Sequence, residues 1–119
     1  MIDILTKRVY DTPEKQDGTR VLVDKIWPRG ISKEDLAADL WNKELAPSTE
    51  LRQWFAHDPD KWGEFRKRYL SELKDRKPLA KKLLNEIRDQ HLTLLYAARD
   101  RRHNHAVVLK EYLQKLRPS

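Results

Sequence analysis

The sequence predicts an α/β domain: a small central sheet, at least partly parallel, with helices packed on it. The pattern of apolar residues changes along the chain in the order strand, strand, several helices, strand and helix. The connection between the second and third strands is long and helical, which suits a parallel pair. A length of 119 residues provides for one hydrophobic core, so residues 1–119 are predicted to form a single compact domain.

Three apolar segments rich in β-branched residues predict the strands. IDILTKRVY at 2–10 and TRVLVDKIW at 19–27 are joined by a polar loop that contains Pro13 and Gly18. LTLLYAA at 92–98 is the third segment. The loop between the first two has about ten residues, near the minimum for a parallel crossover, so the sequence leaves the direction of the first strand open.

Helix starts are marked by residues whose side chains cap a first turn. Ser32 and Ser48 each precede a helical pattern, and Asp58 is followed by Pro59, which suits the first helical position. The stretch 40–45 fits either the end of the first helix or a short strand. The predicted helices occupy, in order, residues 31–41, 49–57, 59–75, 79–87 and 104–116.

Composition excludes several classes of protein. Charged residues make up 37% of the chain and apolar residues 39%, which is typical of a globular protein with a thin core. The absence of cysteine excludes disulfides, thiolate nucleophiles and cysteine metal sites. No apolar run reaches the roughly 18 residues of a membrane span. Since the N-terminus also lacks a signal-peptide pattern, the sequence predicts a cytoplasmic protein without a membrane partner.

Positive charge is concentrated in the second half of the chain. Residues 1–60 contain 9 Lys and Arg against 12 Asp and Glu, whereas residues 61–119 contain 16 against 7. The net charge of +6 therefore arises from the second half. Such asymmetry favours an anionic partner. The alternative is that these side chains mainly keep the protein in solution.

Polar segments follow both strands of the predicted parallel pair, WPRG after the second strand and RDRRHNH after the third. Because parallel strands end at the same edge of a sheet, these segments should converge. Arg29 and Arg99 offer planar donors for phosphate or carboxylate. Trp27 offers a flat face, and the helix start near Asn104 offers free N–H groups. The sequence therefore predicts that a small anionic ligand, nucleotide-like or phosphorylated, binds at this edge.

Each of these residues also has a structural alternative. Trp27 could fill the core or its rim, which would make WPRG a rigid turn. Arg29 could hydrogen-bond to loop carbonyls, and Asn104 could serve only as the cap of the last helix. The convergence of several such residues is what favours a ligand site.

Asp24 and His103 are candidate acid or base groups, although nothing in the sequence demands catalysis. Asp24 lies on an apolar strand, where it could orient an arginine or bind a hydroxyl, or instead face solvent or pair with a lysine. His57 precedes a capped helix and fits either an acid–base role or a structural hydrogen bond. His103 and His105 are two residues apart and no zinc motif is present, so no metal site is predicted. Without a Gly-rich phosphate loop, no cofactor is predicted either.

Two alternative functions remain. Basic residues concentrated between Arg66 and Lys82 could follow a phosphate backbone, which would make the chain a nucleic-acid (RNA) binder, although carboxylates interrupt this region. A protein-interaction or oligomeric module would show an exposed aromatic patch, for example at Trp54 and Phe55. The sequence does not define the oligomeric state.

The longest distinctive segments are KRVYD, DGTRVLVDKIWPRGISKEDL and LTLLYAARDRRHNHAVVLKEYL, with KELAPSTELRQWF and FRKRYLSEL between them. In this order and spacing the chain resembles the YeaO-like family of small bacterial and archaeal proteins, a domain of unknown function. The resemblance covers nearly the whole chain. It implies a compact single-domain α/β fold, and it implies no particular reaction, substrate or cofactor.

Overall fold

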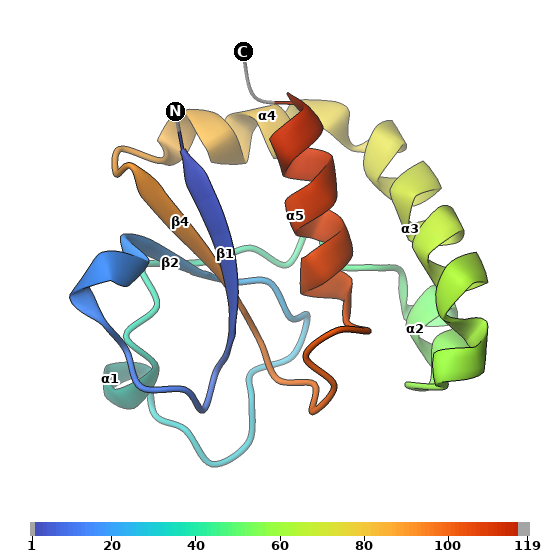
Figure 1. The fold of residues 1–119 in the computed structure, drawn as a ribbon, viewed down its shortest axis with the longest axis horizontal. Coiled ribbons are helices and arrows are strands. Elements are labelled where there is room, and N and C mark those ends of the chain that lie inside the picture. The colour runs from blue at the N-terminus through green and yellow to red at the C-terminus, as the bar shows by residue number, and fades with distance from the viewer. Residues whose placement is uncertain (1, 117–119) are drawn as a thin grey trace.

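A sheet of four parallel strands forms the centre of the structure (Figure 1). The strands are β1 (Asp3–Arg8), β2 (Thr19–Leu22), β3 (Leu40–Trp41) and β4 (His91–Tyr96), in the spatial order β1-β4-β2-β3. The computed structural model describes residues 2–116. β4, the last strand in the sequence, therefore lies between the first two and pairs with both.

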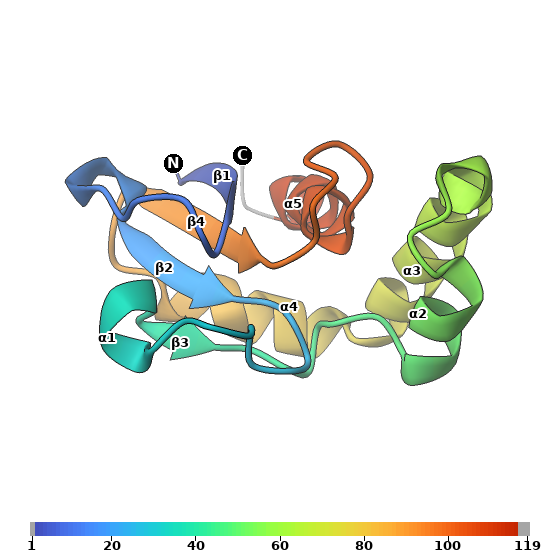
Figure 2. The same ribbon diagram turned by 90° about the horizontal axis from the view of Figure 1, so that it is seen from below.

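Helices cover the two faces of this sheet unequally (Figure 2). One face carries the large core, to which the three long helices contribute, and the other carries a smaller core over the short first helix. Two further segments form short 3-10 helices, η1 (Lys15–Asp17) and η2 (Pro59–Lys61). The α-helices are α1 (Lys33–Leu36), α2 (Thr49–Phe55), α3 (Trp62–Asp75), α4 (Lys77–Glu86) and α5 (His105–Leu116).

Alternation along β4 explains how one strand serves both cores. Leu92, Leu94 and Tyr96 belong to the large core with α3, α4 and α5. Leu95 belongs to the small core, which also contains Leu36 of α1. Because side chains alternate across a strand and both faces are covered, every residue from Leu92 to Tyr96 is buried, as expected of a central parallel strand.

Aromatic packing holds α2 and α3 beside the carboxyl end of the sheet. Phe55 at the end of α2 stacks on Phe65 of α3, with ring centroids 4.2 Å apart. Tyr69, one turn further along α3, is fully buried and donates a hydrogen bond from its hydroxyl to the Leu45 carbonyl. Burial raises the pKa of the Tyr69 hydroxyl well above its usual value, so this group stays a donor at physiological pH.

The predicted fold class is confirmed. The predicted parallel pairing of the second and third apolar segments, which form β2 and β4, is also confirmed. β2 pairs with β4 in parallel from Thr19 opposite Leu92 to Leu22 opposite Leu95. The direction of β1, which the sequence left open, is also parallel, and its neighbour is β4 rather than β2. Of the two possibilities for residues 40–45, the short strand is the one that forms.

The prediction that the second strand extends to residue 27 is wrong. The Val23 amide still donates to the Leu95 carbonyl, but the Ala97 amide donates to the carboxylate of Asp24 instead of to a backbone carbonyl. A side chain has thus replaced the next backbone acceptor of the ladder. The chain beyond Asp24 is therefore released from the sheet, and β2 ends at Leu22.

The predicted helix caps are confirmed. The Ser32 hydroxyl accepts from the amide of Asp35, and the Ser48 hydroxyl accepts from the amide of Leu51. Asp58 accepts from the Asp60 amide and opens η2, which continues into α3. Each cap satisfies one of the amides that a helix start leaves free.

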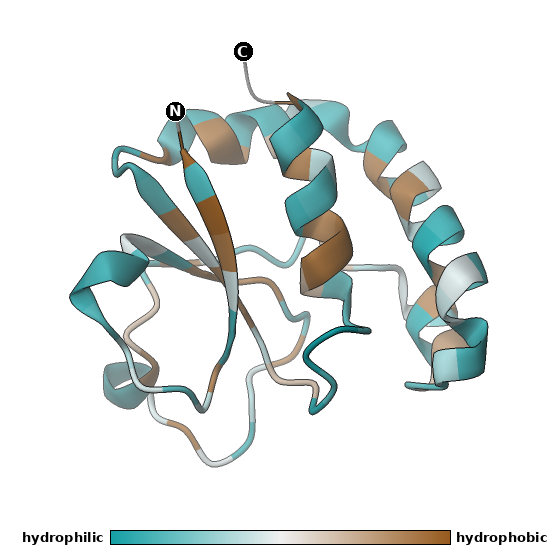
Figure 3. Ribbon diagram, viewed as in Figure 1, coloured by the Kyte–Doolittle hydropathy of each residue, from teal (hydrophilic) through white to brown (hydrophobic). Residues whose placement is uncertain are grey.

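Hydrophobic stretches are visible along β1, β4, α4 and α5, whereas the part of the β4–α5 loop that leads into α5 is hydrophilic (Figure 3). Between residues 2 and 116, none of the helices combines the length and the apolar character that crossing a membrane requires.

Candidate functional site

A cavity of about 670 Å³ lies beyond the carboxyl ends of β2 and β4. Residues 24–26, which follow β2, and residues 97–100, which follow β4, form two of its walls. The start of α5 and parts of α2 and α3 complete it, with Phe55 and Phe65 among the lining side chains. The segments that follow the two parallel strands therefore converge on one space, at the edge where open α/β sheets bind ligands.

The four residues predicted to bind a ligand separate into two pairs. Arg99 and Asn104 line the cavity. Trp27 and Arg29 are not among its lining residues, because the chain turns away from the cavity after Ile26. The structure thus brings together only half of the predicted set.

Trp27 occupies the rim of the small core. Its indole N–H donates to the Ile31 carbonyl at 2.8 Å, and its ring meets that of Trp41 edge to face at 5.3 Å. It packs against the cluster that includes Leu36 and Leu95. These contacts are those of the structural alternative, a tryptophan that fixes the WPRG turn.

Arg29 and Asn104 contribute differently from each other. Arg29 is exposed, and its carbonyl accepts a hydrogen bond from the Tyr10 hydroxyl. Asn104 is 2% exposed and caps α5: its Oδ1 accepts from the Val107 amide, and its Nδ2 donates to the Asp100 carbonyl. Both ends of the Asn104 side chain are therefore used within the protein, although the residue lines the cavity.

Asp24 is neither solvent-facing nor paired with a lysine. Its Oδ2 accepts from the Ala97 amide at 3.0 Å. Its Oδ1 lies 3.1 Å from Nε2 of His105, but the same nitrogen lies 3.0 Å from the Val23 carbonyl and makes its hydrogen bond there. Oδ1 is buried and has no aligned donor. One oxygen of Asp24 thus joins the ends of β2 and β4, and the other has no hydrogen bond in the cavity wall.

His103 lies outside the cavity wall and pairs with Asp100. Its Nδ1 is 2.8 Å from the Asp100 carboxylate, and its ring meets the Trp62 ring edge to face at 5.2 Å. The Arg102 amide, the His103 ring and the His103 amide lower the pKa of Asp100 to about 2. Asp100 is therefore an ionised carboxylate that is hydrogen-bonded within its own loop.

Arg52 is a cavity residue that the sequence reasoning missed. It lies on α2, three residues before Phe55, and lines the cavity with it. Its Nε is buried and has no hydrogen-bond partner. The available signal was its spacing: residues three apart share a helix face, and Leu51 and Phe55 mark the buried face of α2.

His57 enters the cavity wall on strained backbone. Ala56 and His57 have φ values of 46° and 58°, in the left-handed region that residues other than glycine rarely adopt. The Ala56 amide still closes α2 by donating to the Arg52 carbonyl, and the Asp58 amide donates to the Phe55 carbonyl. This turn ends α2 and places His57 in the cavity wall. The strained backbone therefore lies beside the candidate site.

Replacing Ala56 with glycine is expected to raise the free energy of unfolding by about 0.5–1 kcal/mol, because glycine adopts this φ without a Cβ clash. Urea unfolding of Ala56→Gly checks this. Ala38→Gly is the control, since Ala38 is not among the residues with positive φ and should lose stability. Equal losses in both variants would contradict the prediction.

The charges of the cavity wall are unevenly satisfied. Both carboxylates, Asp24 and Asp100, accept hydrogen bonds from protein donors. In contrast, the side chains of Lys25, Arg52 and Arg99 have no ion pair or hydrogen bond within residues 2–116. The wall therefore contains positive side chains that have no direct partner in the described part of the chain, although two carboxylates share the wall with them.

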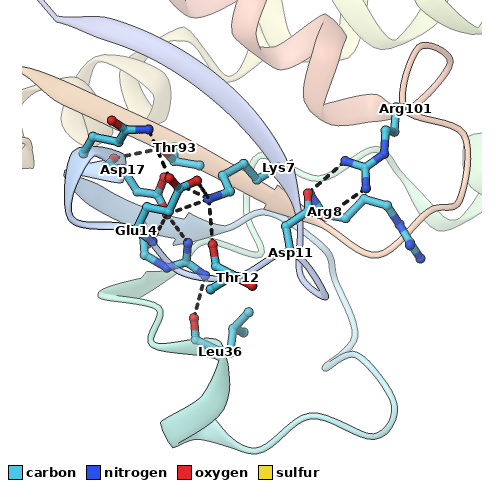
Figure 4. Close-up of polar contacts among 11 residues, drawn as sticks. Lys7, Arg8, Asp11, Thr12, Glu14, Asp17, Leu36, Thr93 and Arg101 are labelled. Carbon is cyan, nitrogen blue, oxygen red and sulfur yellow. Dashed lines mark hydrogen bonds and ion pairs between the residues drawn. The ribbon is translucent and has the colours of Figure 1, made fainter.

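A second polar cluster lies away from the cavity, where the β1–β2 connection packs on the sheet (Figure 4). The Asp17 carboxylate, 2% exposed, accepts from Lys7, from Arg20 at 2.5 Å and from the Glu14 amide. The Thr93 hydroxyl donates to the Asp17 carbonyl. Since all these groups satisfy one another, the cluster serves to fix the connection.

The basic region between Arg66 and Lys82 is partly neutralised. Arg66 pairs with Glu111, and Arg68 pairs with Glu64. Arg76 donates to backbone carbonyls. Binding of nucleic acid to this region stays a prediction, and it would depend mainly on the exposed lysines.

The aromatic patch expected of an interaction module does not form at Phe55. Phe55 is 5% exposed and stacked in the core, so that expectation is wrong. The neighbouring Trp54 is half-buried, with Lys61 and Arg68 over its ring. Within residues 2–116, no group of three or more His, Asp or Glu side chains is placed to hold a metal ion.

Comparisons with known proteins agree with the resemblance seen in the sequence. A family model described as "Inactive DUF488-N3 subclade" matches residues 3–117. The chain is 48% identical over 115 residues to "Uncharacterized protein YeaO" of Escherichia coli, covering 97% of this chain and all of that protein. It is 43% identical over 107 residues to Rv3073c of Mycobacterium tuberculosis and to Mb3100c of Mycobacterium bovis, covering 89% of each chain. No solved structure matches. The chain therefore belongs to the inactive DUF488-N3 subclade and, as its sequence indicated, to the YeaO-like proteins.

Proposed function

We propose that the cavity at the carboxyl edge of the sheet binds a small anionic ligand, of the phosphorylated or nucleotide-like class. The observation that carries this proposal is a set of positive side chains without a direct partner: Lys25, Arg52 and Arg99 line one cavity in which both carboxylates already accept hydrogen bonds from backbone amides. Guanidinium groups match the geometry of phosphate and carboxylate oxygens. An anion supplies the partner that these groups lack.

The size and lining of the cavity support a small molecule. A volume of about 670 Å³ falls within the range of about 300–1,000 Å³ that is typical of small-molecule sites. Phe55, Phe65 and Pro47 provide apolar contact for the part of the ligand that is not charged. This combination of an apolar wall with a few charged groups is typical of sites that bind and orient one compound.

Binding without turnover is the form of this function that the family favours. The description of the subclade as inactive argues against a catalytic role for Asp24 or His103. The contacts of His103 support the same choice, because its ring pairs with Asp100 and lies outside the cavity wall.

Arg52→Gln is expected to weaken binding of inorganic phosphate and ribose 5-phosphate by about tenfold or more. The variant loses the charged hydrogen bond that we propose between the Arg52 guanidinium and the phosphate. Isothermal titration of wild type and variant checks this. Arg88→Gln is the matched control: Arg88 is an exposed arginine that precedes β4, at the opposite edge of the sheet, and its loss should change affinity little.

Two further arms separate the alternatives. Arg29→Gln tests the predicted contribution of Arg29, which lies outside the cavity, and no change is expected. If wild type binds none of these phosphates, the proposal is wrong. If it binds a short RNA instead, with an affinity that falls steeply with salt and equally in Arg52→Gln and Arg88→Gln, the nucleic-acid alternative is favoured.

A further inference from the structure

Two atoms of the cavity residues are buried without a hydrogen-bond partner: Oδ1 of Asp24 and Nε of Arg52. Buried polar atoms in native proteins almost always have a partner. Among the described residues only one other side-chain atom, Nδ1 of His91, shares this condition. His91 lies at the opposite end of β4. Unsatisfied polar atoms are thus concentrated at this cavity, and they comprise one acceptor and one donor.

The acceptor is distinct from the rest of its own carboxylate. Oδ2 of Asp24 is fixed by the Ala97 amide, which holds the side chain in one orientation. Oδ1 faces Nε2 of His105 at 3.1 Å, but an imidazole nitrogen carries at most one proton, and Nε2 makes its hydrogen bond with the Val23 carbonyl. A ligand donor can therefore reach a carboxylate oxygen that is already positioned.

We infer that the ligand of this cavity carries hydroxyl groups besides its anion, as a sugar phosphate does, and that Oδ1 of Asp24 accepts a hydrogen bond from one of them. This inference rests on the proposed function and narrows it from any small anion to a hydroxylated one. The anion occupies the side of Arg52 and Arg99, and a hydroxyl of the same molecule occupies Asp24.

The charge of the wall favours a hydroxyl over an ammonium group as the donor. Lys25, Arg52 and Arg99 place positive charge around the cavity, so a second cation would be repelled. Asp100 adds no free carboxylate, since its oxygens accept from Arg102 and His103. A neutral hydroxyl satisfies Oδ1 without this penalty.

Asp24→Asn provides a nearly isosteric test. The Ala97 amide requires an acceptor, so the amide oxygen of the new side chain takes the place of Oδ2. Its NH₂ group then stands where Oδ1 stood, and a donor replaces the acceptor that faces the cavity. The variant keeps the link between β2 and β4 while reversing the hydrogen-bonding character toward the ligand.

The experiment compares two phosphates of similar shape by isothermal titration: ribose 5-phosphate, and cyclopentylmethyl phosphate, which lacks the hydroxyls. Wild type is expected to bind ribose 5-phosphate about tenfold more tightly. In Asp24→Asn this preference should fall to less than about twofold. The variant should bind cyclopentylmethyl phosphate at least as tightly as wild type does, because a negative charge has been removed from the wall.

The outcomes separate this inference from the proposed function. Equal affinity of wild type for the two phosphates overturns the hydroxyl inference and leaves anion binding intact. A preference that persists in Asp24→Asn overturns the role of Asp24. Failure of wild type to bind either phosphate overturns both proposals. The wild-type comparison is decisive even if the variant does not fold.

Discussion

Gly18→Ala is expected to lower the free energy of unfolding by about 3–5 kcal/mol, because the new Cβ would both strain the backbone and overlap with a neighbouring strand. Gly18 has a φ of +65°, and a Cβ at this position would lie 2.2 Å from the carbonyl oxygen of His91. His91 is the first residue of β4, and the next residue, Leu92, is paired with Thr19. The clash is therefore with backbone that cannot move without disturbing the centre of the sheet.

The other two glycines are matched controls for this prediction. Gly30 has a φ of +75° but open space where a methyl group would lie, so Gly30→Ala should cost only the backbone strain, about 1–2 kcal/mol. Gly63 lies in α3, where an added methyl group would meet nothing within 4 Å, and Gly63→Ala should stabilise by up to about 1 kcal/mol. Urea unfolding of the three variants gives the comparison. A cost for Gly18→Ala no greater than that for Gly30→Ala would show that the close approach is not important.

Asp17→Asn is expected to cost about 3 kcal/mol, because removal of one member of a buried ion pair leaves the other uncompensated. Arg20 is 5% exposed and donates to Asp17 and to the carbonyls of Ala37 and Leu36. Lys7 also loses a partner. Lys7→Met is the control, because the Lys7 side chain is more exposed than that of Asp17 and its loss leaves the Asp17–Arg20 pair intact.

The pH dependence of stability tests the same pair. Burial by itself raises the pKa of Asp17, but the Glu14 amide, Lys7 and Arg20 outweigh it, and the pKa is lower than its usual value. A carboxyl group whose pKa is lower in the folded state stabilises above the unfolded pKa of about 3.9, and this contribution is lost as pH falls below it. Asp11, whose pKa Arg101 lowers to about 2 against the opposing effect of burial, acts in the same direction.

Wild type should therefore lose stability steeply between about pH 4 and pH 2, and Asp17→Asn should lose less over the same interval. Urea unfolding at a series of pH values measures both slopes. Parallel slopes for the two proteins would mean that Asp17 has no altered pKa in the folded state, and the proposed importance of the pair would be wrong.

Local signals explain why so much of the fold could be predicted. Ser32, Ser48 and Asp58 identify helix starts through hydrogen bonds made within a few residues. The long helical connection between β2 and β4 predicts their parallel pairing from chain length alone. Such features depend on neighbouring residues, so the sequence contains what is needed to predict them.

Features that depend on distant contacts could not be predicted. The end of β2 depends on which acceptor the Ala97 amide finds, and that acceptor is the side chain of Asp24, 73 residues earlier. Similarly, Trp27 turns toward Trp41 and the small core, which takes it and Arg29 out of the cavity wall.

The cavity lies at the edge of the sheet where the sequence predicted a ligand site, but only two of the four predicted residues line it. Its location follows from a general property of parallel sheets, and Arg99 and Asn104 lie there. Arg52 comes from α2, which contacts the site through the stacking of Phe55 on Phe65. Its spacing from Phe55 places Arg52 on the inner face of α2, but that α2 lies beside the ends of β2 and β4 is shown only by the assembled structure.

The central position of β4 also determines when the protein can fold during its synthesis. β1 and β2 are made early, but they do not pair with each other, and the strand that joins them begins at His91. Until then the emerging chain has strands without their central partner, and their apolar residues, such as Ile4 and Val21, remain uncovered. Such contacts between distant residues form slowly, and uncovered strand edges favour aggregation. We therefore expect the sheet to close only after β4 has been made, and until then the nascent chain is the form of this protein that is most prone to aggregate.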